Sequence, residues 1–183
     1  MTRVYLGVGS NIERERYIVA GLDALQGLLG DLELSSVYDS AAIGFEGQAF
    51  LNLVVGIDTD WAVGELARRL RHIETEHGRP AKALPNSSRQ LDIDILTYGN
   101  LAGVVDGVSL PREEILFNAF VLCPLAELAP MELHPMERKS YQALWSAYGN
   151  VQALRRVAFE WRGRKISEDE GLCETRAVGV STP

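Results

Sequence analysis

Several stretches of the chain alternate apolar with polar residues, and this period-two pattern predicts strands with one buried face. The clearest is 91–96, where Leu91, Ile93 and Ile95 alternate with Asp92 and Asp94. Residues 32–38 alternate in the same way. Residues 4–8 and 50–58 are almost continuously apolar, as expected for strands covered on both faces. A short further strand is predicted at 104–110.

Other stretches repeat their apolar residues every three or four positions, which predicts helices. Gly30 is a suitable stop for the first helix, and Asp60 is a suitable N-cap for the second. The spacing of Val151, Leu154 and Val157 predicts a last helix near the C-terminus. The predicted helices cover residues 18–29, 63–77, 117–128, 141–148 and 151–161.

Up to residue 96 the predicted order is strand, helix, two strands, helix and strand, the βαββαβ arrangement of ferredoxin-like sheets. The predicted fold class is therefore α+β, with an additional strand and C-terminal helices packed on one sheet. We expect the first and fourth strands to be neighbours at the centre of the sheet. A length of 183 residues suits one domain, over 1–166. From Ser167 the composition predicts a poorly ordered acidic tail, 167–183.

The composition narrows the function classes. A net charge of −7 argues against non-specific nucleic-acid binding, which needs a basic surface. No apolar run approaches the length of a membrane span, and the N-terminus lacks the apolar region of a secretion signal. Cys123 and Cys173 show neither disulfide nor zinc spacing, which fits a reducing compartment. We therefore expect a cytoplasmic protein with no nucleic-acid or membrane partner.

The acidic pair in 91–96 is the main candidate for chemistry. Side chains two apart on a strand share one face and lie about 6–7 Å apart, so Asp92 and Asp94 are expected to stand together beside Arg89. Two carboxylates at this range repel unless a cation neutralises them, and Mg²⁺ prefers such oxygen ligands. The alternative is an edge strand whose polar face meets water.

Two further features have both a functional and a structural interpretation. Gly7 to Asn11 predicts a turn whose backbone amides meet a ligand, and a plain strand-to-helix turn explains the same residues almost as well. Asn52 interrupts an apolar strand and must satisfy its amide donors and its carbonyl. It does so either within the fold, which is the commoner case, or by pairing with the edge of a heterocycle.

An ordered set of fragments between about Val4 and Pro130 resembles a known family. The fragments are Leu6-Gly7-Val8-Gly9-Ser10-Asn11, Phe50-Leu51-Asn52, Ile73-Glu74 with Gly78-Arg79, Arg89-Gln90-Leu91-Asp92-Ile93-Asp94-Ile95, and Pro111 with Phe120-Val121-Leu122 and Pro124-Leu125. With them the chain resembles the bacterial 6-hydroxymethyl-7,8-dihydropterin pyrophosphokinases of folate biosynthesis. The resemblance implies a transfer of pyrophosphate from ATP to the hydroxymethyl group of a reduced pterin, with release of AMP.

The resemblance also implies roles for single residues. Asp92 and Asp94 match positions that hold two magnesium ions against the ATP phosphates, and Arg79 and Arg89 match arginines near the triphosphate. The nucleotide-binding positions that it implies are Glu74, Arg79, Lys82, Arg89, Ile95 and Arg112. A buried ion pair explains Glu74 equally well. The family resemblance also implies a monomer.

The implied pterin site is an aromatic sandwich with an amide at the ring edge. Phe50 and Phe120 match the two sides of the sandwich, and Asn52 matches the amide. Ser40 and Ile43 match loop positions that offer backbone groups to the ring.

Most departures from the family pattern fall on the nucleotide side, and one falls in the pterin loop, where Ser40-Ala41-Ala42 replace the family's Thr-Pro-Pro. The family has an arginine, an aromatic with Gly-Pro, a histidine and a second arginine where this chain has Ala81, Asn86, Arg112 and Asn118. Each lost charge-assisted phosphate contact costs about 1.5–3 kcal/mol. Arg112 and Lys82 are candidates to compensate. The sequence therefore also admits a paralogue that binds a pterin-like heterocycle without transferring pyrophosphate.

Overall fold

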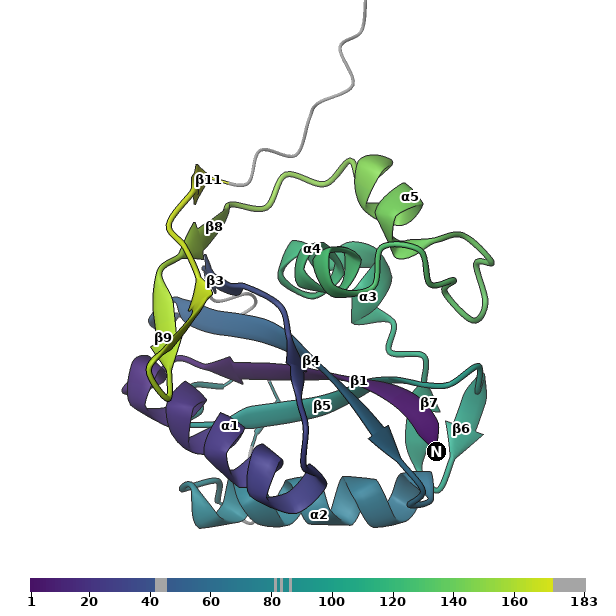
Figure 1. The fold of residues 1–183 in the computed structure, drawn as a ribbon, viewed down its shortest axis with the longest axis horizontal. Helices are drawn as coiled ribbons and strands as arrows, with labels where there is room; N and C mark the ends of the chain where they lie inside the picture. The colour runs from purple at the N-terminus through teal and green to yellow at the C-terminus, as the bar shows by residue number, and fades with distance from the viewer. Residues whose placement is uncertain (42–45, 81, 83, 86, 173–183) are drawn as a thin grey trace, which may run out of the picture.

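β1 (Thr2–Ser10) runs through the interior of a seven-stranded antiparallel sheet, which organises the fold (Figure 1). This computed structural model describes residues 1–41, 46–80, 82, 84–85 and 87–172. Across the sheet the strands follow the order β11 (Gly171–Leu172), β8 (Leu154–Val157), β3 (Val37–Ser40), β4 (Phe50–Thr59), β1 and β5 (Asp92–Tyr98), while β2 (Glu33–Leu34) also pairs with β4. Two separate antiparallel pairs are β6 (Gly103–Val105) with β7 (Val108–Leu110) and β9 (Phe159–Trp161) with β10 (Arg164–Ser167).

Helices cover both faces of the sheet (Figure 1). On one face lie α1 (Arg14–Leu29) and α2 (Val63–Glu76); on the other lies α4 (Ala119–Leu128), accompanied by α3 (Glu114–Phe117) and α5 (Tyr141–Ser146). The element order confirms the predicted α+β class with its βαββαβ core. Among the residues that the structure describes, no helix has both the length and the apolar character that a membrane crossing requires.

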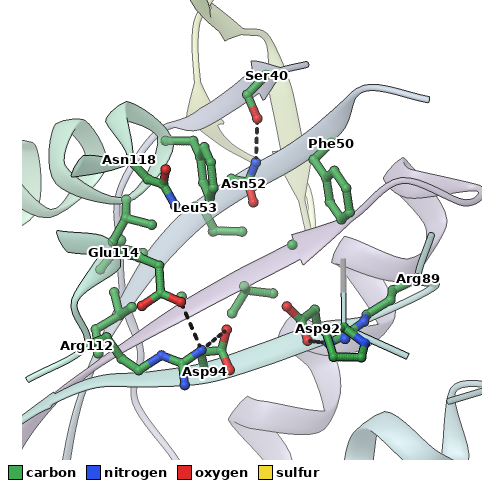
Figure 2. Close-up of a pocket in the computed structure, with 18 of the residues that line it drawn as sticks. Ser40, Phe50, Asn52, Leu53, Arg89, Asp92, Asp94, Arg112, Glu114 and Asn118 are labelled. Carbon is green, nitrogen blue, oxygen red and sulfur yellow. Dashed lines mark hydrogen bonds and ion pairs between the residues drawn. The ribbon is translucent and has the colours of Figure 1, made fainter. Parts of the chain in front are cut away.

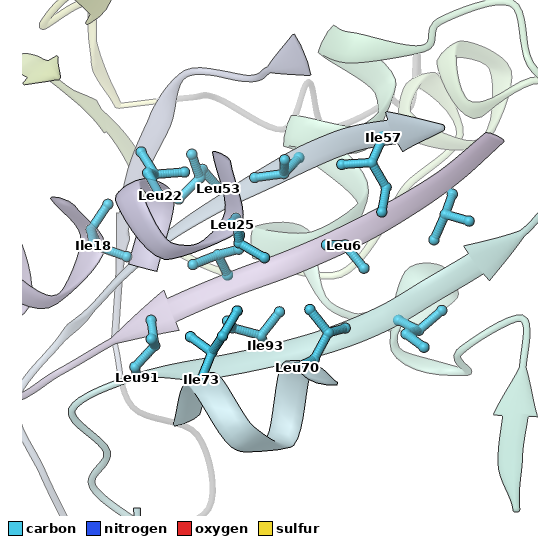
Figure 3. Packing of buried hydrophobic residues seen from close by; sticks show 14 of the residues in the cluster. Leu6, Ile18, Leu22, Leu25, Leu53, Ile57, Leu70, Ile73, Leu91 and Ile93 are labelled. Atoms are coloured by element: carbon cyan, nitrogen blue, oxygen red, sulfur yellow. The ribbon is translucent and has the colours of Figure 1, made fainter. Parts of the chain in front are cut away.

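The alternation of side chains along the strands sorts them between two cores. Leu6, Leu53 and Ile93 face α1 and α2 and pack with the apolar stripes of these helices (Figure 3). On the same three strands, Tyr5, Val54 and Leu96 belong to the second core, under α4. Full burial of one such side chain contributes about 1.5–3 kcal/mol. The apolar pattern therefore fixes which residues of β1, β4 and β5 face α4, and the polar ones among them form the site described below.

Two predictions about the strands that carry the candidate site are wrong. Gly7 to Ser10 form no turn, because they continue β1 and pair with β4. The predicted first and fourth strands, β1 and β5, are indeed neighbours, but β5 lies at the edge of the sheet rather than at its centre. Part of this edge is covered, since the backbone N–H of Arg112 donates to the carbonyl of Leu96 over 2.8 Å.

The strands predicted at 32–38 and 104–110 are each divided in two. Between β2 and β3, the hydroxyl of Ser35 accepts from the N–H of Val54, and Ser36 donates through both its N–H and its hydroxyl to Glu127. Such side-chain bonds replace those of the ladder. Between β6 and β7, Asp106 and Gly107 both take positive φ, 49° and 80°, which is the geometry of a two-residue hairpin turn.

The helices differ from the prediction in three places. Asp60 does not cap α2, because its carboxylate pairs with the N-terminal amine at 2.9 Å and Ala62 is the N-cap. Asn118 has extended backbone and separates α3 from α4 within the predicted helix 117–128. No helix forms at 151–161, where β8 and β9 lie instead.

The C-terminal segment extends the sheet. β8 pairs with β3, and β11 pairs with β8. Ser167 is buried, and its hydroxyl accepts from the N–H of Val37 over 3.1 Å. The prediction of a poorly ordered tail is therefore wrong for residues 167–172, and residues 173–183 lie outside the described residues.

Candidate active site

A cavity of about 690 Å³ opens on the α4 face of the sheet (Figure 2). β1, β4 and β5 contribute to its floor, and the segments around residues 79–89 and 112–121 contribute to its walls. Most of the residues predicted for the pterin and for the metal and phosphates line this same cavity: Ser40, Phe50, Asn52, Phe120, Arg79, Arg89, Asp92, Asp94 and Arg112. In Figure 2 the first three of them lie on one side of β1, with Asp92 and Asp94 on the other.

Strand register explains why these side chains meet. Gly9 lies opposite Asn52 of β4 on one side and opposite Asp92 of β5 on the other, and Gly7 lies opposite Asp94. Neither glycine has a side chain, so nothing rises from β1 between the amide and the two carboxylates. A Cβ at position 9 would come within 2.7 Å of the Oδ1 atom of Asn52. The two glycines are therefore a bare floor that a flat ligand can approach.

The fold satisfies only part of the amide of Asn52. Its Nδ2 donates to the hydroxyl of Ser40 over 2.9 Å, and Ser40 is itself buried. Its Oδ1 lies over Gly9 and has no hydrogen-bond donor among the described residues. The sequence left open whether Asn52 is satisfied within the fold or by a ligand, and each interpretation applies to one end of the amide. The nitrogen bonds within the fold. The oxygen lies at the cavity floor, where a ligand can donate to it.

Two arginines hold Asp92, and a buried glutamate holds one of them. The Oδ1 atom of Asp92 lies 2.5 Å from Nη1 of Arg89 and 3.4 Å from Nη1 of Arg79. Arg79 pairs more closely with Glu74, at 2.8 Å. Glu74 is 2% exposed and also accepts from the N–H of Ile93 over 2.8 Å. Burial raises the pKa of Glu74 to about 7, although the N–H of Ile93 opposes this. Glu74 is thus the buried partner that directs Arg79 toward Asp92.

Asp94 has a single, looser ion pair among the described residues. Its Oδ2 lies 3.3 Å from Nη2 of Arg112, and the same nitrogen lies 3.4 Å from Oε1 of Glu114 (Figure 2). Burial raises the pKa of Asp94 to about 6, and the charge of Asp92 adds to the rise. This end of the strand therefore carries negative charge that its arginine neutralises incompletely.

The acidic pair fits a divalent cation that arrives with phosphate. Within the described part of the chain, no group of three or more His, Cys, Asp and Glu side chains is arranged to hold a metal ion. Magnesium at Asp92 and Asp94 would therefore take its other ligands from phosphate and water, as it commonly does. A bound cation would also relieve the repulsion between the two carboxylates.

Asn11 connects the two halves of the site, although it does not line the cavity. Its Oδ1 accepts from the N–H of Arg89 over 2.7 Å, and its Nδ2 donates to the carbonyl of Gln48 and to the hydroxyl of Ser88. Asn11 is 1% exposed. The end of β1 thus ties the loop that carries Arg89 to the segment that precedes Phe50.

Some predicted site residues lie elsewhere. The side chain of Ile95 packs in the core against α1 and α2, because odd-numbered residues of β5 such as Ile93 face that way. Lys82 is exposed and lines a neighbouring cavity of about 260 Å³, which shares Arg79 and Arg89 with the main one. Glu74 lies behind Arg79 rather than in the cavity wall. Ile43, Ala81 and Asn86 lie outside the described residues.

The cavity also contains residues that were not predicted as site residues. Arg71, Glu114 and Phe117 contribute to its wall, and Phe117 is 45% exposed. Asn118 also lines the wall, and the sequence had marked it only as a departure from the family pattern. No local pattern marks Glu114 or Phe117, because their place depends on how α3 packs against α4. Arg71 lies one helical turn before Glu74, so its spacing alone was compatible with this position.

Comparison with known proteins identifies the family of the chain. The family model described as 7,8-dihydro-6-hydroxymethylpterin-pyrophosphokinase (HPPK) matches residues 5–130. The 2-amino-4-hydroxy-6-hydroxymethyldihydropteridine pyrophosphokinase of Aquifex aeolicus is 36% identical over 141 residues, which cover 76% of this chain and 88% of the relative. The enzyme of the same name from Pseudomonas aeruginosa is 38% identical over 132 residues, covering 70% and 81%.

Solved structures extend the likeness in fold. The triple mutant of Plasmodium falciparum HPPK-DHPS with STZ-DHP superposes with a TM-score of 0.69 at 13% identity, covering 91% of this chain and 47% of that one. The same triple mutant with pteroate gives a TM-score of 0.67 at 12% identity, covering 91% and 48%. The chain thus spans about half the length of these two structures, and at such identities they show the fold alone.

The family match covers most of the chain and includes every strand that forms the cavity floor, and the matched bacterial relatives are covered over more than four fifths of their length. The chain therefore belongs to the 7,8-dihydro-6-hydroxymethylpterin-pyrophosphokinase family.

Proposed function

We propose that this protein transfers pyrophosphate from ATP to the hydroxymethyl group of 6-hydroxymethyl-7,8-dihydropterin, a step of folate biosynthesis. One observation carries the proposal: Phe50, Asn52 and Phe120 share a cavity with Asp92 and Asp94, and bare glycine backbone lies between the amide and the carboxylates. The hydroxymethyl oxygen forms a bond to the β-phosphorus while the bond from that phosphorus to the α,β-bridging oxygen breaks. AMP leaves with the bridging oxygen, and the hydroxyl proton is released.

The roles proposed for single residues follow from their places. Two aromatic rings can enclose a flat bicyclic ring, and the oxygen of Asn52, which has no donor among the described residues, can accept from its edge. Asp92 and Asp94 would hold two magnesium ions, which supply charge neutralisation at the transferred group when bound. Arg79 and Arg89 can bind phosphate oxygens as planar forks. We also propose a monomeric protein in the cytoplasm.

The direct test is to incubate the protein with ATP, Mg²⁺ and 6-hydroxymethyl-7,8-dihydropterin and to measure AMP by chromatography. We expect AMP and the pyrophosphorylated pterin in equal amounts, and none of either from an Asp92→Asn variant. AMP formation no faster than that of the variant would refute the proposed reaction for this pair of substrates.

A second candidate is a module that binds a pterin-like heterocycle without transferring pyrophosphate. The observation that favours it is the neutral Asn118 in the cavity wall, where the family has an arginine. Calorimetry separates the two candidates. The enzyme binds both the pterin and a nonhydrolysable ATP analogue with Mg²⁺, whereas the module binds the pterin and not the nucleotide.

Replacing Gly9 by alanine is expected to weaken pterin binding about 10- to 100-fold. The new Cβ would lie 2.7 Å from Oδ1 of Asn52, so the amide must move from the ring edge and leave polar groups unpaired. The obstructing atom ends a side chain, so the melting temperature should change little. Calorimetry with the pterin measures the loss. The matched control is Gly27→Ala in α1, where a Cβ has open space and pterin affinity should not change.

A further inference from the structure

We propose that Arg112 is the resident counter-cation of Asp94, that it passes to the nucleotide phosphates when magnesium takes Asp94, and that Glu114 is the positioning residue which keeps it within reach of both. This inference rests on the proposed function in one respect only, namely that the cavity receives a magnesium nucleotide.

A hydrogen bond fixes the backbone of Arg112, whereas its guanidinium is shared between two carboxylates. Its backbone N–H donates to the carbonyl of Leu96 over 2.8 Å, which anchors the residue two positions beyond Asp94 along β5. The guanidinium nitrogen Nη2 then lies 3.3 Å from Asp94 and 3.4 Å from Glu114. Charge-assisted hydrogen bonds are normally about 2.7–2.9 Å long. One nitrogen is therefore shared between two carboxylates at distances that hold it by charge without locking it on either.

The ion pairs Arg89–Asp92 and Arg79–Glu74 are shorter and less exposed than those of Arg112, and we call them locked pairs. Arg89 lies 2.5 Å from Asp92, and Arg79 lies 2.8 Å from Glu74, with both arginine side chains less than a fifth exposed. The side chains of Arg112, Asp94 and Glu114 are each about one third or more exposed (33%, 41% and 37%). Solvent screens this trio more than the locked pairs, so exchange of partners costs less.

Charge decides where Arg112 goes when a metal binds. Magnesium on Asp94 would place a second cation beside the guanidinium, and like charges at this range repel. Glu114 is not one of the two carboxylates proposed to hold magnesium, so it can remain paired with Arg112. The nucleotide supplies new acceptors, because its phosphate oxygens match the planar fork of an arginine. Arg112 thus opposes the metal when nucleotide is absent and assists nucleotide binding when the metal is present.

These two effects have opposite signs, which makes the proposal testable in binding experiments. We expect the Arg112→Gln variant to bind Mn²⁺ alone about 3- to 10-fold more tightly, as measured by electron paramagnetic resonance. We expect the same variant to bind a nonhydrolysable ATP analogue with Mg²⁺ about 10- to 100-fold more weakly, as measured by calorimetry. In Glu114→Gln the arginine is left to Asp94 alone, so Mn²⁺ should bind about 3-fold more weakly. Glu114→Asp should restore most of that loss.

The control is Arg68→Gln, which removes an exposed arginine of α2 that pairs with Glu65 outside the cavity. It should change neither affinity. A parallel loss of Mn²⁺ and nucleotide affinity in Arg112→Gln, or an unchanged Mn²⁺ affinity, would overturn the proposal, because a merely structural role weakens both ligands together. Neither measurement needs turnover. If the opposite shifts appear and no AMP forms, the proposed reaction fails and this inference stands; if AMP forms and the shifts are parallel, the reverse holds.

Discussion

Replacing Asp94 by asparagine should lower the rate of AMP formation at least about a thousandfold. The carboxylate is one of two that can hold magnesium against the phosphates, and charge neutralisation by metal contributes several kcal/mol to such transfers, with about 1.4 kcal/mol for each factor of ten. An amide keeps the size of the side chain and loses the charge, so pterin affinity should stay close to that of the native protein. Steady-state AMP formation and pterin calorimetry measure the two quantities.

The same substitution should stabilise the protein when no metal or nucleotide is present. The folded state raises the pKa of Asp94 to about 6 through burial and the charge of Asp92, so the ionised carboxylate opposes folding at neutral pH. Because the side chain is 41% exposed, solvent screening reduces the gain to about 1 kcal/mol. A domain of this size then melts about 2–4 °C higher.

The sign of the pH dependence follows from this shift. Between its unfolded pKa and a folded pKa of about 6, Asp94 binds more protons in the folded state, so its contribution opposes folding above pH 6 and fades as the pH falls toward 4. The stability gained in Asp94→Asn should therefore be larger at pH 7.5 than at pH 5. Asp58→Asn is the matched control, because Asp58 is 43% exposed and pairs with Arg3 at 3.1 Å, away from the cavity. A gain as large in the control would show that the effect does not come from the site.

Local patterns were sufficient for the parts of the site that depend on one strand. The alternation at 91–96 places Asp92 and Asp94 on one face and Ile93 on the other, and the structure agrees. The same parity assigns Ile95 to the core, so its predicted nucleotide contact conflicted with the pattern that defined the strand. Family resemblance supplied that position, and the direction of the side chain leaves only the backbone of Ile95 for such a contact.

Features that depend on the pairing of distant strands were beyond local patterns. Gly7 and Gly9 suggest a turn when read along the chain, because glycine is common in turns. Their use becomes clear only when Asn52 and Asp92 are placed on either side of Gly9. The helix predicted near the C-terminus is wrong for a related reason. Val157 joins a strand because β3 offers it a partner edge, and this partner is more than a hundred residues away in the sequence.

Removing the carboxylate of Glu74 should cause the largest loss of stability among these variants, about 3–5 kcal/mol for Glu74→Ala. The substitution leaves Arg79, whose side chain is 13% exposed, without its 2.8 Å partner and the buried N–H of Ile93 without an acceptor. The melting temperature should fall by about 10 °C. Arg79, no longer held toward Asp92, should also bind phosphate less well, so AMP formation should fall even below the melting transition. Thermal unfolding and AMP assays measure both effects.

Glu65 provides the comparison on the same helix. It pairs with two arginines, Arg68 and Arg69, but its side chain is 31% exposed, whereas that of Glu74 is 3% exposed. Exposed ion pairs contribute little, so Glu65→Ala should lower the melting temperature only slightly and leave AMP formation unchanged. Glu74→Gln should fall between the two alanine variants in stability, since its amide oxygen can still accept from the N–H of Ile93, yet it should be as inactive as Glu74→Ala because the charge that orients Arg79 is gone. Equal losses of stability in Glu74→Ala and Glu65→Ala would mean that burial does not set the strength of the Glu74–Arg79 pair.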